Sequence, residues 1–292
     1  MAVTAAGACR NACVTASRIA PEHAVSAWMY LCFPLLGLAA GVLAGLLGIG
    51  GGLVIIAALA WLLPLFGIPQ DAAMHAALAS SLASIILTGL SSARAHARRG
   101  SVLWPTVAWM VPGLLLGGWL GSGLAVGLDD GTLRWVVAVY CLVAAWQIGF
   151  GGTRAPADGS EVAAPRGWPM TVAGGGIGAL SAVVGIGGGS MTVPLLVWRG
   201  VRPVLAVGTS SACGVAIALS AAAGYALHAP PGALPQHAVG YVYLPAALGV
   251  AAASVLAAPW GTRLAHQLSG TALRRVFAGF LLLVGVSVAL SG

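Results

Sequence analysis

Long apolar runs are the feature that most constrains the fold of this chain. A helix needs about 20 apolar residues to cross a bilayer, and eight runs approach or exceed that length. They cover residues 28–47, 72–90, 102–126, 133–150, 168–184, 203–227, 239–261 and 272–290, with shorter runs at 53–66 and 190–198. Only 7% of the 292 residues are charged, whereas soluble domains carry about a quarter. The sequence therefore predicts an all-α polytopic membrane protein, with about eight full transmembrane helices and two short broken or re-entrant segments.

An internal duplication organises these runs. Each short run follows the pentapeptide Gly-Ile-Gly-Gly-Gly, at 48–52 and again 137 residues later at 185–189. Residues 76–82 (AALASSL) resemble 206–212 (AVGTSSA) at a spacing of 130, a match that pairs Ala79 with Thr209. Residues 100–105 match 240–245 at a spacing of 140. Because the matches occur in the same order in both halves, they indicate two copies of one unit.

Arginine positions predict how the two copies lie in the membrane. We expect a poorly ordered leader at 1–27, a first transmembrane repeat at 28–150, a linker on the cytoplasmic side at 151–167 and a second repeat at 168–292. An odd number of net crossings in each half puts ten arginines on one face: Arg94, Arg98, Arg99, Arg154, Arg166, Arg199, Arg202, Arg263, Arg274 and Arg275. The positive-inside rule makes that face cytoplasmic and both termini periplasmic. The result is an inverted repeat, as in many secondary transporters.

The paired glycine motifs are the first candidate binding site. Glycine-rich stretches disfavour a continuous helix, and a short helix that begins after a break directs its free N–H groups and its positive dipole end at the cavity before it. Two such breaks at inverted positions would converge near the middle of the bilayer and bind an anion without a buried cation. The candidate residues are Gly48, Gly50, Gly51, Gly52, Gly185, Gly187, Gly188 and Gly189. The alternative is that these glycines serve close helix packing.

Hydroxyl-bearing residues form a second candidate group. Ser80, Ser81, Thr209, Ser210 and Ser211 lie on two long helices in matching parts of the repeat. Their hydroxyls could donate hydrogen bonds to a small oxyanion. For each residue taken alone, hydrogen bonding between or within helices is the alternative role.

Ionisable residues are scarce within the apolar runs, which hold no Lys, Asp or Glu. His75 is a candidate coupling residue for a proton, although a histidine at a helix end also fits an interfacial position. The five cysteines lack the spacing of a disulfide framework or a zinc site, so we expect no metal and no cofactor. The net charge of +7 comes from arginines at the ends of the runs, which explains the basic balance by topology and not by nucleic-acid binding.

The chain resembles the sulfite exporter TauE/SafE family over about residues 30–290. The resemblance rests on GLLGIGGGLV at 45–54, VVGIGGGSMTVPLL at 183–196, the two hydroxyl-rich segments and the basic loop ARAHARRG at 93–100. It implies export of small sulfur-containing anions, such as sulfite or an organosulfonate, across the bacterial inner membrane. The two halves differ where Ala57 stands opposite Pro194, so we expect them to contribute unequally to a site.

The function that best fits the sequence is a secondary transporter that moves a small anion by alternating access. Its partners would be the anion, the lipid bilayer and a coupling proton or sodium ion, with the oligomeric state left open. A channel-like or carboxylate-type organic anion permease is the alternative. An intramembrane hydrolase fits poorly, because His75 and Ser80 are five residues apart and do not share a helix face. A membrane scaffold would leave the duplicated breaks without a purpose.

Overall fold

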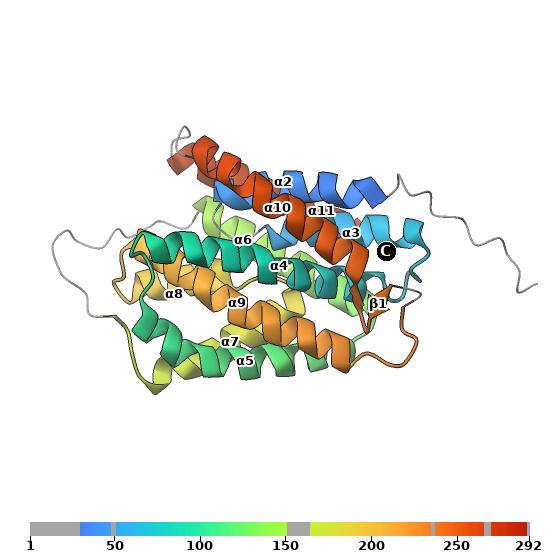
Figure 1. The fold of residues 1–292 in the computed structure, drawn as a ribbon, viewed down its shortest axis with the longest axis horizontal. Coiled ribbons are helices and arrows are strands. Elements are labelled where there is room, and N and C mark those ends of the chain that lie inside the picture. Colours follow the sequence, from blue (N-terminus) through green and yellow to red (C-terminus); the bar gives the residue numbers. More distant parts are fainter. Residues whose placement is uncertain (1–29, 48–50, 151–163, 235–236, 266–269, 291–292) are drawn as a thin grey trace, which may run out of the picture.

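The computed structural model describes residues 30–47, 51–150, 164–234, 237–265 and 270–290, and in that part of the chain it is a bundle of helices (Figure 1). The first half contains α2 (Cys32–Leu47), α3 (Gly52–Leu62), the 3-10 turn η2 (Leu63–Phe66), α4 (Ala73–Arg98), α5 (Trp104–Val126) and α6 (Asp130–Phe150). The second half contains α7 (Trp168–Val184), α8 (Gly189–Trp198), α9 (Pro203–Leu227), α10 (Leu244–Ala265) and α11 (Gly270–Leu290). A small hairpin, β1 (Ala238–Val239) and β2 (Val242–Tyr243), joins α9 to α10.

The helices follow the apolar runs closely. Helices α4, α5 and α9 are long and apolar enough, by length and composition, to cross a membrane. Proline in the first turn starts α5, α7 and α9, where its missing N–H costs nothing. The sequence predicts a loop for the basic segment at 93–100, and this prediction is wrong for residues 93–98. Helix α4 continues to Arg98, so Arg94 lies on its final turns.

The two broken helix pairs each return to the end of the bundle at which they begin. In the first pair, the rings of Tyr30 and Phe33 before and within α2 lie 5.6 and 4.7 Å from the ring of Phe66, which ends η2. In the second, the Arg199 guanidinium after α8 lies 3.8 Å from the sulfur of Met170, in the first turn of α7. Each pair therefore begins and ends at the same end of the bundle, a re-entrant form that was one of the two arrangements the sequence left open.

The two re-entrant pairs start from opposite ends of the bundle. Phe33 contacts Tyr243 of the hairpin, with ring centroids 6.0 Å apart, at the end where α9 finishes and α10 begins. The start of α7 lies beside the start of α5, where the Thr106 hydroxyl donates a hydrogen bond to the carbonyl oxygen of Pro165 at 2.9 Å. Helices α4 and α9 run between these ends and pack on each other (Figure 1).

Close contacts between small residues hold the outer helices of the two halves together. Helix α2 packs along α10, and α7 packs along α5. The first helix of each half therefore packs against a helix of the other half. A Cβ on Gly41 would lie 2.5 Å from the carbonyl oxygen of Ser254, and one on Gly178 would lie 2.6 Å from that of Leu114. Without side chains at these positions the backbones approach closely, as is common in membrane helix pairs.

Candidate functional site

The tips of the two re-entrant pairs meet in the interior, where Ser81 of α4 joins them. The Ser81 hydroxyl lies 3.2 Å from the carbonyl oxygen of Gly52, at the start of α3, and 3.5 Å from that of Gly185, at the end of α7. A Cβ on Gly52 would lie only 3.0 Å from the same Gly185 oxygen. Two glycine motifs 137 residues apart in sequence are thus in contact. Gly48 and Gly50 lie outside the described residues.

Left-handed glycines make the second tip. Gly185 ends α7 at φ 74°, and Gly188 precedes α8 at φ 71°. Residues with a Cβ adopt this conformation at a cost, so the turn needs glycine at both positions. Gly51 precedes α3 in the same conformation, at φ 64°. Each tip therefore places the N-terminus of a short helix in the interior, where the first N–H groups have no acceptor within the helix.

Three buried hydroxyls surround the second tip without a hydrogen-bond partner among the described residues. They are Ser181 on α7, Thr192 on α8 and Ser210 on α9, which are 0%, 0% and 3% exposed. An unsatisfied buried polar group costs about 1–3 kcal/mol, so such groups are rare in native proteins. Three of them at one place indicate a region that a polar molecule would stabilise.

The positions of these hydroxyls follow from contacts with the turn. Ser181 accepts the N–H of Ile186 at its carbonyl oxygen, and its hydroxyl lies 3.5 Å from where a Cβ on Gly188 would stand. Thr192 donates its N–H to the carbonyl oxygen of Gly188 at 2.9 Å. Ser210 lies one helical turn before Gly214, whose Cβ position would be 2.5 Å from the Gly187 oxygen. The three residues therefore line one break from three helices.

Ser80 and Thr209 each accept a backbone hydrogen bond from the segment that leads into a long helix. The N–H of Tyr243, before α10, donates to Ser80 at 3.0 Å, and the N–H of Leu103, before α5, donates to Thr209 at 3.0 Å. Leu103 and Tyr243 are partners in the sequence repeat. The hydrogen bonds therefore pair Thr209 with Ser80, one residue away from the Ala79 that the sequence match chose.

Ser211 lies apart from the tips. Its hydroxyl is 3.3 Å from that of Ser92 and donates to the carbonyl oxygen of Val207 at 3.0 Å. It therefore links α4 to α9 instead of facing the break, and the alternative role for this residue is the one observed.

Sequence reasoning missed two contributors to the second tip. Ser181 gives no signal in the repeat, since its counterpart 137 residues earlier is Ala44. Tyr140 of α6 hydrogen-bonds through its hydroxyl to Ser190, the second residue of α8, and no local motif connects these positions. The first half has Leu53 and Ile55 where the second has Ser190 and Thr192, so the second tip is the more polar of the two. This difference agrees with the expected inequality of the halves.

His75 is buried within the protein, with 3% of its surface exposed. It lies near Asp130 and Arg134 at the end of the bundle where α4 begins, five residues before Ser80. The charged residues described as buried are these two, Asp130 and Arg134; Asp130 contacts His75 and pairs with Arg134. The described part of the chain has no group of three His, Cys, Asp or Glu side chains that could hold a metal ion.

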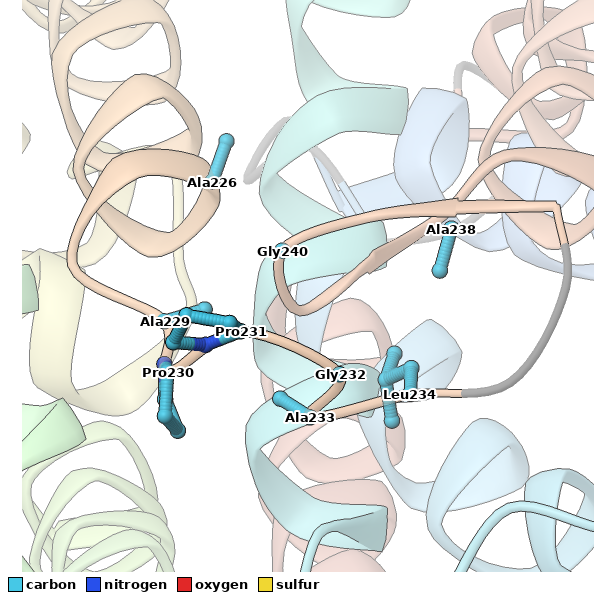
Figure 2. Close-up of a pocket in the computed structure, with 9 residues that line it drawn as sticks. All are labelled: Ala226, Ala229, Pro230, Pro231, Gly232, Ala233, Leu234, Ala238 and Gly240. Carbon is cyan, nitrogen blue, oxygen red and sulfur yellow. The ribbon is translucent and has the colours of Figure 1, made fainter.

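A cavity of about 250 Å³ lies at the same end, between the loop after α9 and the hairpin (Figure 2). Its walls include Ala226, Pro231, Leu234 and Gly240, and none of its lining residues has a charged or hydroxyl side chain. It therefore offers an anion only backbone groups, and the glycine tips remain the better candidate for the binding site.

Comparison with known proteins decides the family. The profile of the family described as Sulfite exporter TauE/SafE matches residues 33–288, which include both glycine tips and every described helix from α3 to α10. The chain belongs to the TauE/SafE sulfite exporter family. This family is one of membrane transporters, and the apolar helices of the chain agree with a multi-pass membrane protein.

Two curated relatives of this TauE/SafE chain have related names. A "Probable membrane transporter protein" of Haemophilus influenzae is 34% identical over 265 residues, which cover 89% of this chain and 98% of the relative. "Probable membrane transporter protein YunE" of Bacillus subtilis is 27% identical over 197 residues, covering 62% of this chain and 72% of the relative. No solved structure matches the chain.

Proposed function

We propose that this TauE/SafE protein is a secondary carrier, not an enzyme, that exports a small sulfur oxyanion of the sulfite or organosulfonate type by alternating access. The observation that carries the proposal is the meeting of the two glycine tips at Ser81, beside three hydroxyls that have no hydrogen-bond partner in the part of the chain that the structure describes. Discontinuous helices whose N-termini point at a central substrate are typical of carriers built from inverted repeats.

The chemistry of the second tip suits an anion. Ser181, Thr192 and Ser210 can each donate a hydrogen bond, and the N–H groups at the start of α8 add the positive end of the helix dipole. No Asp or Glu among the buried residues lies at the tips to repel a negative charge. A neutral donor set also lets the empty site reorient without moving a fixed cation through the bilayer, which would be costly.

Several observations support an inverted repeat of residues 28–150 and 168–292. Helices α2 and α7 carry glycines at Gly37 and Gly174, 137 residues apart, and both face a carbonyl oxygen of the helix packed against them. The hydrogen bonds to Ser80 and Thr209 are equivalent in the two halves. Re-entrant pairs that start from opposite ends are what such a repeat would produce.

The charge distribution supports a cytoplasmic location for one end. Six exposed arginines lie where α4 and α8 end and where α7 and α9 begin: Arg94, Arg98, Arg99, Arg166, Arg199 and Arg202. The positive-inside rule favours the cytoplasm for this end. The first and last described helices contact α3 and η2 toward the opposite end of the bundle. Near the start of α2, Tyr30 contacts Phe66, and near the end of α11, Ser287 accepts a hydrogen bond from Trp61. Periplasmic termini in a bacterial inner membrane follow from this orientation.

Flux in liposomes tests the proposal. Purified protein would be reconstituted and offered sulfite, thiosulfate, sulfoacetate, sulfolactate, lactate or chloride. We expect saturable flux of at least one sulfur oxyanion, reduced at least tenfold by Ser210→Ala and unchanged by Gly176→Ala, a position where an added Cβ meets nothing within 4 Å.

The other outcomes separate the alternatives. Flux that does not saturate would favour a channel, and preference for lactate would favour a carboxylate permease. Folded protein that moves none of these anions would refute the sulfur-anion assignment.

A further inference from the structure

His75 lies in a buried polar cluster that the anion site does not use. Its Nε2 is 3.1 Å from the carbonyl oxygen of Ala125, at the end of α5. Its ring stacks on that of Tyr241 in the hairpin, with centroids 4.9 Å apart and an angle of 24°. Residues from α4, α5 and the hairpin thus enclose one imidazole.

Helix α6 supplies the charges that face this imidazole. The Oδ1 atom of Asp130 lies 3.5 Å from His75 Nδ1 and accepts the N–H of Met74 at 2.8 Å. The Oδ2 atom accepts from Arg134 Nε at 2.7 Å. Both side chains are 9% exposed. The Met74 N–H and Arg134 Nε therefore hold the buried Asp130 carboxylate in place independently of His75.

The hairpin and the segment before α4 contribute the remaining titratable groups. Tyr241 covers one face of the imidazole, and burial together with the carboxylates of Asp71 and Asp130 raises the pKa of its phenol. The phenol therefore stays neutral, and Asp71 is exposed. Among the described residues, Asp130 is the carboxylate in contact with the ring.

The hydrogen-bond partner at Nε2 fixes which ring nitrogen of neutral His75 carries the proton. A carbonyl oxygen can only accept, so Nε2 must carry a proton. In the neutral imidazole, Nδ1 then presents a lone pair to the Asp130 carboxylate, and two acceptors face each other. One proton on Nδ1 converts this contact into a charge-assisted hydrogen bond. The cluster has a place for one more proton.

Hydrogen bonds between backbone groups and side-chain hydroxyls connect this cluster to the glycine tips. The N–H of Tyr241 donates to the carbonyl oxygen of Tyr225 at 3.3 Å, and the Tyr225 hydroxyl donates to the carbonyl oxygen of Ala182 at 3.2 Å. Ala182 is the neighbour of Ser181. The other strand of the hairpin donates from Tyr243 to Ser80, on the helix that carries His75. A shift of the hairpin would therefore displace residues on both sides of the anion site.

We propose that His75, with Asp130 as its counter-ion, binds the proton that is coupled to anion movement. The Asp130–Arg134 pair holds the carboxylate in place, and the proton enters at Nδ1 and leaves from it, with no bond broken elsewhere. The hairpin transmits the change through Tyr241. The coupling of this proton to anion movement rests on the proposed carrier function, whereas the proton site at His75 does not.

Two measurements test the proton site and its coupling separately. The first uses 15N-histidine-labelled protein in lipid nanodiscs, with His75 assigned by the signal lost in His75→Gln. We expect its Nδ1 to take up a proton as the pH is lowered across the range in which the protein stays folded, and Asp130→Asn to shift that uptake. An Nδ1 that stays unprotonated over the whole range would overturn the site.

The second measurement follows protons and anions together in liposomes. The probe is thiosulfate, or another anion from the panel that the protein moves and that stays unprotonated near neutral pH, and a luminal pH dye reports protons. We expect a fixed proton-to-anion ratio, which falls to background in His75→Gln while anion flux continues. The matched control is His228→Gln, an exposed histidine at the same end of the bundle.

The outcomes distinguish the two claims. A wild-type proton-to-anion ratio in His75→Gln would overturn the coupling role. Absence of anion flux from the wild type would refute the carrier function, and the nanodisc titration would still decide whether His75 is a proton site.

Discussion

Gly188→Ala provides the sharpest test of how the second tip is built. Gly188 has φ 71° and ψ −4°, and a residue with a Cβ pays about 1–2 kcal/mol in this conformation. The added methyl would overlap Ile217 Cδ1, the flexible end of a side chain, and overpacking of this kind costs about 1–3 kcal/mol. The sum is a loss of about 2–5 kcal/mol.

Thermal melting of the purified protein in detergent measures this loss, which corresponds to a drop on the order of 5–15 °C. Two matched variants separate the causes. Gly67→Ala has φ 80° with nothing within 4 Å, so it reports backbone strain alone. Gly176→Ala lies inside α7 with open space around it and should gain up to about 1 kcal/mol from helix propensity. If Gly188→Ala melts no lower than Gly67→Ala, the proposed overlap at the tip is wrong.

Three further single variants and one double variant test other contacts by the same melting assay. Ser81→Ala removes the hydroxyl between the two tips and should cost about 0.5–2 kcal/mol; a neutral effect would contradict a stabilising bridge. Arg134→Met leaves the buried Asp130 carboxylate without its Nε donor and should cost about 3–5 kcal/mol, part of which Arg134→Met/Asp130→Asn should restore; equal melting of both variants would count against the ion pair. Gly117→Ala should cost about 3 kcal/mol, because its Cβ would overlap the backbone carbonyl oxygen of Gly175 and no rotation relieves that overlap; melting like that of Gly176→Ala would argue against the close α5–α7 crossing.

Much of the helical frame could be predicted because it depends on local properties of the sequence. Apolar runs, prolines in first turns and glycine at helix breaks act over a few residues, so the positions of α5, α8 and α9 follow the sequence closely. Two helices depart from this: α10 begins only at Leu244, because residues 239–243 of the predicted run belong to the hairpin, and α4 is longer than its apolar run. Its polar final turns at 93–98 look like a loop by hydropathy, yet they continue the helix beyond the apolar run.

The site could be predicted only in part, because its residues come from different helices. The glycine motifs identified the tips through their repetition, and the contact between Gly52 and Gly185 agrees with that prediction. Repetition could not reveal Ser181 or Tyr140, whose counterparts in the other half have different chemistry. It also misassigned the partner of Thr209 by one residue, since a match of short polar segments carries less information than a hydrogen bond. The partners of His75 are 50 and 55 residues away along the chain at Ala125 and Asp130, which no local pattern encodes.

Protection of a cysteine at position 210 tests the central claim most directly. In a variant without the five native cysteines, Ser210→Cys would be treated with a thiol-reactive sulfonate in the presence and absence of the transported anion. His228→Cys, at an exposed position, serves as the control. We expect slow modification at position 210 that the anion suppresses, with no effect of the anion at position 228. Modification at position 210 that proceeds at the same rate with and without anion would contradict an anion site at the meeting point of the two glycine tips.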